Sequence, residues 1–294
     1  MFDPTKIIID SYVERLQTNY LSIYTRLEPD FPGVLGFCGR IALESIANTD
    51  AAYHGLSHTI QVTEAGQEIL RAKHISRGGV TPRDWLHVII SLLCHDIGYL
   101  RGVCLGDQET AYVKDYAGNM ITLPSGATDA ALTPYHVTRS QIFVRERFAT
   151  SIAKLDVDFI SSCIERTRFP VPQNSAYAKT DDYPGLVRAA DLIGQMGDRD
   201  YLRKCAALYR EFEETGAARL LNYTSPDDLR RSYPKFFWAT VYPLIDDAIR
   251  YLQVTYEGRQ LLNNLYANVF IEEHQYLGRC SNVTQQVVED VILA

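Results

Sequence analysis

Histidine and aspartate residues at four places in the chain have the types and spacing of a metal centre. His54 and His58 are four residues apart, His95 and Asp96 are adjacent, and Asp191 lies farther along the chain. If the segment around His54 is helical, both imidazoles share one helix face. Imidazole and carboxylate donors together suit Mn, Fe, Ni, Co or Zn, and carboxylates also suit Mg. Such an ion lowers the pKa of bound water, which supplies hydroxide near neutral pH.

Burial favours a shared ion over separate structural roles for these residues. A single histidine on a helix is more often a core or surface residue than a ligand, and Asp191 alone could be a surface carboxylate. However, Asp191 lies in an apolar helical stretch, and His95-Asp96 follows the apolar run 86–94. A buried carboxylate or imidazole needs a partner that offsets its lost hydration. We therefore predict that His58, His95, Asp96 and Asp191 bind one cation.

The elements that must position these residues are predicted to be helices. Apolar residues three and four positions apart indicate an amphipathic helix over 7–20, and Thr81-Pro82-Arg83-Asp84 is typical of a helix start. That helix is expected to end at Gly98. Further helices are expected over 37–46, 57–73, 137–148, 156–167, 186–196, 200–214, 234–256 and 260–276. Strand signals are nearly absent, and 117–134 is predicted to be a functional loop. We expect an all-α fold.

Length and composition describe a globular chain of one large domain or two small ones, and we expect a single helical domain. The 294 residues include 29 basic and 36 acidic residues, so the net charge is −7. We expect a helical core over about 51–200, with added helices over 1–50 and 201–294. The acidic balance argues against binding to duplex nucleic acid, and no apolar run reaches the roughly 20 residues of a membrane span. Six cysteines without a CxxC pair, and no secretory signal, predict reduced thiols in the cytoplasm.

The order of the polar residues resembles H…HD…D, the signature of the HD-domain metal-dependent phosphohydrolases. The likeness is strongest to the branch that contains the class I cyclic-nucleotide phosphodiesterases. Residues 53–63, YHGLSHTIQVT, resemble that family's Y-H-N-x-x-H-A-x-D-V, and 91–98, SLLCHDIG, resemble its L-x-x-L-x-H-D helix. Ala190-Asp191 resembles its last metal-binding aspartate. The resemblance covers about 51–197 and implies an HD-domain helical core with extra N- and C-terminal helices.

By this resemblance the protein would hydrolyse a phosphate ester or cyclic phosphodiester with a metal-activated hydroxide. The first ion would be held by His58, His95, Asp96 and Asp191. Asp96 would bridge to a second ion, and His54 would be the general acid that protonates the leaving oxygen. The substrate would be a small phosphorylated molecule, a nucleotide or a relative of one. One or two ions of Mn, Mg, Zn, Ni or Fe would serve as cofactor.

The sequence departs from the family pattern at several positions. Gly55 and Gln61 replace the family's Asn and Asp. Residues 236–244, FFWATVYPL, resemble its F-I-x-x-I-V-x-P helix, on which Phe236 would clamp a base. On that register the purine-reading glutamine falls at Tyr233, whose phenol cannot offer the same amide face. An aromatic stripe at helical spacing is also typical of a core, so both interpretations of Phe236 stay open.

Four further polar residues are candidates near the substrate. His136 ends the long loop and could be a second-metal ligand, a group behind the ligands, or a polar residue at a helix start. Arg139 lies three residues on and could bind a phosphate through two hydrogen bonds. Glu165 could reach metal-bound water and Arg168 a phosphate, or the two could form a solvated ion pair.

Two other functions fit the same residues. One is a di-iron HD oxygenase on the same ligand scaffold, and the other is a non-catalytic nucleotide-binding regulatory protein with a vestigial site. Motifs of other enzyme classes, such as the P-loop, GxSxG and HExxH, do not occur. The terminal helices could pack on the core or join copies of the chain into a homo-oligomer.

Overall fold

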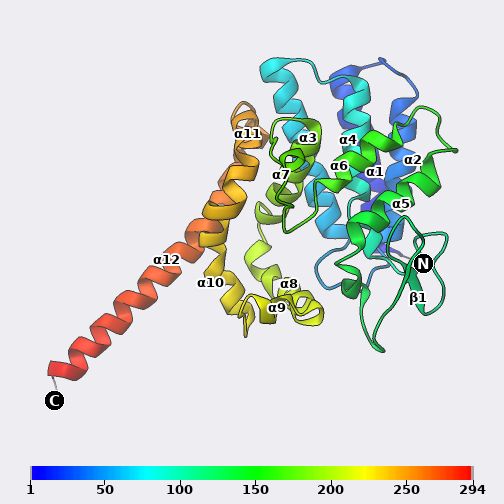
Figure 1. Cartoon of the computed structure of the whole chain (residues 1–294). Coiled ribbons are helices and arrows are strands. Elements are labelled where there is room, and N and C mark those ends of the chain that lie inside the picture. The colour runs from blue at the N-terminus through cyan, green and yellow to red at the C-terminus, as the bar shows by residue number, and fades with distance from the viewer. Residues whose placement is uncertain (1, 293–294) are drawn as a thin grey trace.

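The chain folds as an assembly of α-helices with one small β-hairpin, which confirms the all-α prediction (Figure 1). The computed structural model describes residues 2–292, and side chains for residues 2–275. The helices are α1 (Pro4–Tyr24), α2 (Phe31–Ile46), α3 (Leu56–Arg77), α4 (Pro82–Cys94), α5 (His136–Phe148), α6 (Val157–Glu165), α7 (Tyr183–Met196), α8 (Tyr201–Thr215), α9 (Ala217–Leu220), α10 (Pro226–Phe236), α11 (Tyr242–Leu252) and α12 (Tyr256–Ile292). The antiparallel strands are β1 (Ala111–Val113) and β2 (Met120–Thr122). Within this described part, no helix combines the length and apolar character needed to cross a membrane.

Helix α4 lies in the centre of the molecule because apolar residues occupy nearly every position from Trp85 to Cys94. All of its residues from Trp85 to Cys94 are buried, and it packs on α2, α3, α6 and α7. A helix without a polar face is stable only where other elements cover it. It begins as predicted, with a capping box in which Thr81 and Asp84 each bond the other's backbone N–H.

The end of α4 differs from the prediction in a way that matters for the site. The helix stops at Cys94 rather than at Gly98, and a short 3₁₀ turn follows over Ile97–Tyr99. His95 and Asp96 therefore lie where the helix has just ended. Because the backbone is no longer a regular α-helix there, the adjacent side chains of His95 and Asp96 can point toward the same place.

Two glycines allow close approaches around this turn. A Cβ at Gly194 of α7 would lie 2.5 Å from the Cα of Val62 in α3, and a Cβ at Gly98 would lie 1.9 Å from the carbonyl oxygen of His136. Neither position can carry a side chain unless backbone moves. The Ser140 hydroxyl completes the second approach, because it accepts from the Gly98 N–H at 2.9 Å and donates to a carbonyl of the same turn. Helices α3 and α7 therefore touch closely, and α5 begins directly against the turn after α4.

Two regions differ from their predicted secondary structure. The β1–β2 hairpin was not expected, and the predicted loop 117–134 contains β2 and a 3₁₀ turn over Asp129–Leu132. Strands of three residues are too short to show a reliable alternation. The single helix predicted over 234–256 is instead the end of α10, a π-helical segment (Phe237–Val241) and α11, and α9 and the rest of α10 were not predicted. Pro243 lacks an N–H and so interrupts regular α-helical bonding through this region.

Helices from both ends of the chain flank the core. Helix α1 packs mainly on α2, and the pair also contacts α3 and α4. Helix α12 packs against α10 and α11, then extends away from the body toward the C-terminus (Figure 1). The terminal segments predicted as additions to the core are thus helical, with α12 much longer than expected.

The cysteines among the described side chains are buried, and none of them forms a disulfide. These free cysteines are Cys38, Cys94, Cys104, Cys163 and Cys205. Cys280 lies outside the described side chains. Burial raises the pKa of the Cys38 thiol to about 12, so this residue is an inert apolar group at neutral pH.

Candidate metal centre

Three helices bring the predicted ligand residues to one point. His58 lies in the first turn of α3, Asp191 lies within α7, and His95 and Asp96 follow α4. The close contact of α3 with α7 at Gly194 holds the first two residues near each other. We call His58, His95, Asp96 and Asp191 the ligand cluster.

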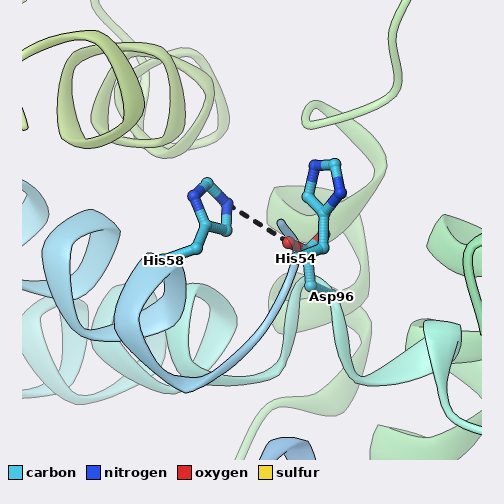
Figure 2. Close-up of side chains that lie close together, drawn as sticks. All are labelled: His54, His58 and Asp96. Atoms are coloured by element: carbon cyan, nitrogen blue, oxygen red, sulfur yellow. Dashed lines mark ion pairs between the residues drawn. The ribbon is translucent and has the colours of Figure 1, made fainter. Parts of the chain in front are cut away.

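The polar atoms of the ligand cluster lie at ion-pair distances. His58 Nε2 is 3.2 Å from Asp96 Oδ2 and 3.5 Å from Asp191 Oδ1 (Figure 2 shows the first contact). His95 Nε2 is 3.2 Å and 3.6 Å from the same two oxygens. Atoms bound about 2.1 Å from one ion lie roughly 3.0–3.4 Å apart at octahedral or tetrahedral angles. The observed spacing is close to what a single cation requires.

Three of these atoms have no hydrogen bond within the described part of the chain. They are His58 Nε2, His95 Nε2 and Asp96 Oδ2, which are near one another but not aligned as hydrogen bonds. All three residues are exposed by 5% or less. A buried polar group without a partner costs about 1–3 kcal/mol. A cation would satisfy the three atoms together, so the histidines and aspartates of this cluster could hold a metal ion.

Two histidines are oriented toward Asp96 by backbone carbonyls. His95 Nδ1 lies 2.7 Å from the carbonyl oxygen of Leu92, and His136 Nδ1 lies 2.6 Å from that of Thr133. Each contact keeps a proton on Nδ1 and leaves Nε2 free to bind an ion. His136 Nε2 is 3.7 Å from Asp96 Oδ1, the oxygen that does not face His95. Asp96 therefore presents one oxygen to the ligand cluster and the other to His136.

His54 stands beside the ligand cluster and is held by Glu211 of α8. Helix α3 begins two residues after His54, so the helical face that His54 and His58 were expected to share does not form. His54 Nδ1 instead lies 2.5 Å from Glu211 Oε2, and Glu211 Oε1 accepts from the backbone N–H groups of Tyr53 and His54. The His54 ring stacks on Tyr99 with a centroid distance of 4.7 Å. Figure 2 shows His54 close to Asp96.

Glu211 is the functional candidate that the sequence did not reveal. It lies 157 positions after His54, so no local pattern links the two residues. Its one signal is its place three residues after the buried Leu208, where an acidic residue on the apolar side of α8 is unusual. A buried carboxylate of this kind needs a partner, and here the partner is the imidazole.

In the protein without a cation, the electrostatics favour the charged forms of His54, His95 and the two carboxylates. Burial lowers the pKa of His95, but the charge of Asp96 and contacts with Asp191 outweigh it and raise this pKa well above 6.5. Burial opposes the charged form of His54 too, yet Glu211 raises its pKa. The pKa values of Asp96 and Asp191 are lowered despite burial, because the histidines stabilise the carboxylates. A bound cation would replace the imidazole protons as the balancing positive charge.

Arg139 does not reach the site, contrary to the phosphate-binding role considered for it. Its guanidinium is completely buried and donates to both carboxylate oxygens of Asp107. It also donates to the carbonyls of Gly98, Leu100 and Val113. All five N–H groups are therefore used, and none is left for a phosphate.

Glu165 and Arg168 form an ion pair of 2.7 Å, which is one of the two roles expected for them. Glu165 also accepts from Gln141 and Tyr177, and Arg168 donates to Thr138. No hydrogen bond or ion pair joins either residue to the ligand cluster, although both side chains lie within the described part.

Phe236, the candidate base clamp, packs edge to face on Phe169 with ring centroids 5.8 Å apart. Phe169 is 47% exposed, so the pair reaches the surface. Tyr233, at the position of the family's purine-reading glutamine, is buried against Tyr201 with centroids 5.0 Å apart. The clamp role of Phe236 stays a prediction.

Comparison with known proteins places the chain in one family. A family model described as Npun_R2479-like matches residues 2–275, so the chain belongs to the Npun_R2479-like family. No curated protein matches the chain. The matched region contains the whole ligand cluster together with His54 and Glu211.

Proposed function

We propose that this member of the Npun_R2479-like family is a metal-dependent phosphohydrolase of the HD-domain type. The proposal depends on one observation: buried and otherwise unpaired atoms of His58, His95 and Asp96 meet Asp191 at distances suited to one cation. The H…HD…D order of these residues, which resembles the HD-domain signature, supports the same reaction class. The substrate is a phosphate ester or cyclic phosphodiester of a nucleotide or a related small molecule.

The ligand cluster would hold the cation, with two imidazole nitrogens and two carboxylate oxygens as donors. This donor set suits Mn, Fe, Ni, Co or Zn, and Mg at the carboxylate side. A divalent ion there would neutralise charge on a phosphoryl oxygen and lower the pKa of bound water. Side chains of the protein itself would bind the substrate and transfer its protons.

His54 is the group that we assign to the leaving oxygen. Its Nδ1–H donates to Glu211, so Nε2 is the nitrogen that can carry a proton to substrate. Glu211 stabilises the imidazolium form, and the stacked ring of Tyr99 restricts rotation of the imidazole. A positioned general acid contributes about 10²–10⁴-fold to rate.

His136 supports a second candidate function. Its Nε2 faces Asp96 Oδ1 at 3.7 Å, and its Nδ1 is already occupied by the carbonyl of Thr133. With Asp96 it could hold a second ion, as the di-iron HD oxygenase reaction requires. Oxygen uptake with Fe(II) and a polyol or phosphonate, without hydrolysis of any phosphate ester, would select this function instead.

The test combines metal analysis with a hydrolysis screen of the full chain. Protein loaded with Mn, Mg, Zn, Ni or Fe is assayed on nucleoside mono-, cyclic and triphosphates. We expect His58→Ala to lose both metal and turnover, because one of four ligands is gone. His54→Ala should retain metal and lose about 10²–10⁴-fold in rate.

His274→Ala is the matched control, since His274 is an exposed histidine of α12. It should retain metal and activity. Wild-type protein that retains no ion and turns over no substrate with any metal would overturn the proposed function. Normal turnover by His54→Ala would remove only its role as acid.

A further inference from the structure

A small cavity lies behind His58. Its volume is about 130 Å³, and its lining includes His58, Ser57, Asp198, Lys204 and Ala207. His95, Asp96 and Asp191 are not among the lining residues, so the cavity borders the ligand cluster at His58. The space exceeds that of several waters at about 30 Å³ each.

The second ring nitrogen of His58 has no partner among the described residues. Its Nε2 faces Asp96 and Asp191, whereas Nδ1 lies on the opposite edge of the ring (Figure 2) and is buried without a hydrogen bond. His95 differs, because its Nδ1 meets the carbonyl of Leu92. A histidine that binds a metal through Nε2 carries a proton on Nδ1 and almost always donates it to an acceptor.

Asp198 supplies an acceptor on the wall of the same cavity. Its side chain is 9% exposed, and its Oδ2 accepts from Lys204 Nζ at 2.5 Å. Lys204 also donates to the Ser57 hydroxyl at 2.9 Å, and Asp198 Oδ1 accepts from the Asp200 N–H. Because each carboxylate oxygen can accept two hydrogen bonds, Asp198 has capacity left for another donor.

We propose that the cavity is a water site through which Asp198 accepts the Nδ1–H of His58 and so orients this imidazole for its cation. The inference depends on the proposed metal centre. The cavity has the size and the polar partners that a bridging water needs. Lys204, which also donates to Ser57, fixes the Asp198 carboxylate. Asp198 is a positioning residue that acts through His58.

The first experiment measures the zinc affinity of the full chain by competition with a chromophoric chelator. Asp198→Asn retains the shape of the side chain but weakens the acceptor, and we expect about a 10- to 100-fold loss of affinity. Asp200→Asn is the matched control. Its carboxylate pairs with Arg203 at the surface, so wild-type affinity is expected.

A second variant tests the role of the water without changing the charge of Asp198. Ala207→Leu fills the cavity without changing any ionisable group, and we expect it to weaken zinc binding by about tenfold while the melting temperature is unchanged or higher. It decides the question alone if Asp198→Asn does not fold.

Wild-type affinity in Ala207→Leu and in folded Asp198→Asn would overturn the water site. The same conclusion follows if a crystal structure of the zinc-loaded protein has no water between His58 Nδ1 and Asp198. Wild-type protein that binds no zinc or other ion would instead overturn the proposed metal centre, so the two failures are distinguishable.

Discussion

Two buried charged clusters in this protein are built in opposite ways. Arg139 is completely buried, and its five guanidinium N–H groups all have acceptors on Asp107 and on nearby carbonyls. In the ligand cluster, His58, His95 and Asp96 are buried almost as deeply, yet each has a polar atom without a hydrogen bond. Both clusters contain residues that the sequence marks as functional candidates.

The difference separates a structural charge from a candidate metal site. A buried polar group that has its partners needs nothing more, whereas an unpaired group requires an explanation such as an ion. Arg139 bonds the carbonyls of Gly98 and Leu100, so it holds the turn that presents His95 and Asp96. One cluster therefore supports the backbone of the other.

The largest expected effect comes from a substitution of Arg139, whose N–H groups all have hydrogen-bond acceptors. Arg139→Met leaves Asp107 buried without its cationic partner, and removal of one partner of a buried pair costs about 3–5 kcal/mol. Urea unfolding of the protein without metal should measure this loss. Arg145→Met is the control, because its exposed pair with Asp158 contributes about 0–1 kcal/mol. Equal effects of the two substitutions would contradict the comparison.

A smaller effect is expected when a cation binds to the ligand cluster. A cation at about 100 times its dissociation constant should raise the unfolding free energy by about 2.7 kcal/mol. Thermal unfolding with and without a chelator measures the change in wild-type protein, and His58→Ala should show none. If the chelator has no effect on metal-loaded wild-type protein, the unpaired atoms do not form a cation site.

The smallest effect is the pH dependence of the ligand cluster. Without a cation, the raised pKa of His95 stabilises the folded protein fully below pH 6.5, and this stabilisation is lost as the pH rises through the higher pKa of the folded state. The lowered pKa values of Asp96 and Asp191 stabilise the folded protein above pH 3.8, and this stabilisation is lost as the pH falls through their lower folded-state pKa values. The stability contributed by these groups is therefore greatest between pH 3.8 and pH 6.5.

Cation binding has the opposite dependence on pH, because it requires deprotonated imidazoles and releases their protons. Affinity for the cation should rise as the pH increases from 6.5 through the raised folded pKa of His95. Calorimetry in buffers with different ionisation enthalpies counts the protons released. A dissociation constant that does not change over this range would contradict the balance of charges described for the ligand cluster.

Local patterns in the sequence predicted the all-α fold. The order of His58, His95, Asp96 and Asp191 along the chain singled out four residues that the fold brings together. The apolar run of α4 and the capping box of Thr81 and Asp84 are short-range features, so the position and start of this helix follow from neighbouring residues. The H…HD…D order indicates a possible cation site, since only a few residue types bind cations. Short strands and proline-interrupted helices carry weaker patterns, which is why the hairpin and the π-helical segment were not predicted.

Only the tertiary structure decided what surrounds those residues. The pairing of His54 with Glu211, the burial of Arg139 on Asp107, and the close approach of Gly98 to the start of α5 each join segments far apart in the chain. Hydropathy and spacing report the direction of a side chain within its own element. They do not report which distant element packs against it, and hydrogen bonds and burial in this protein depend on that packing.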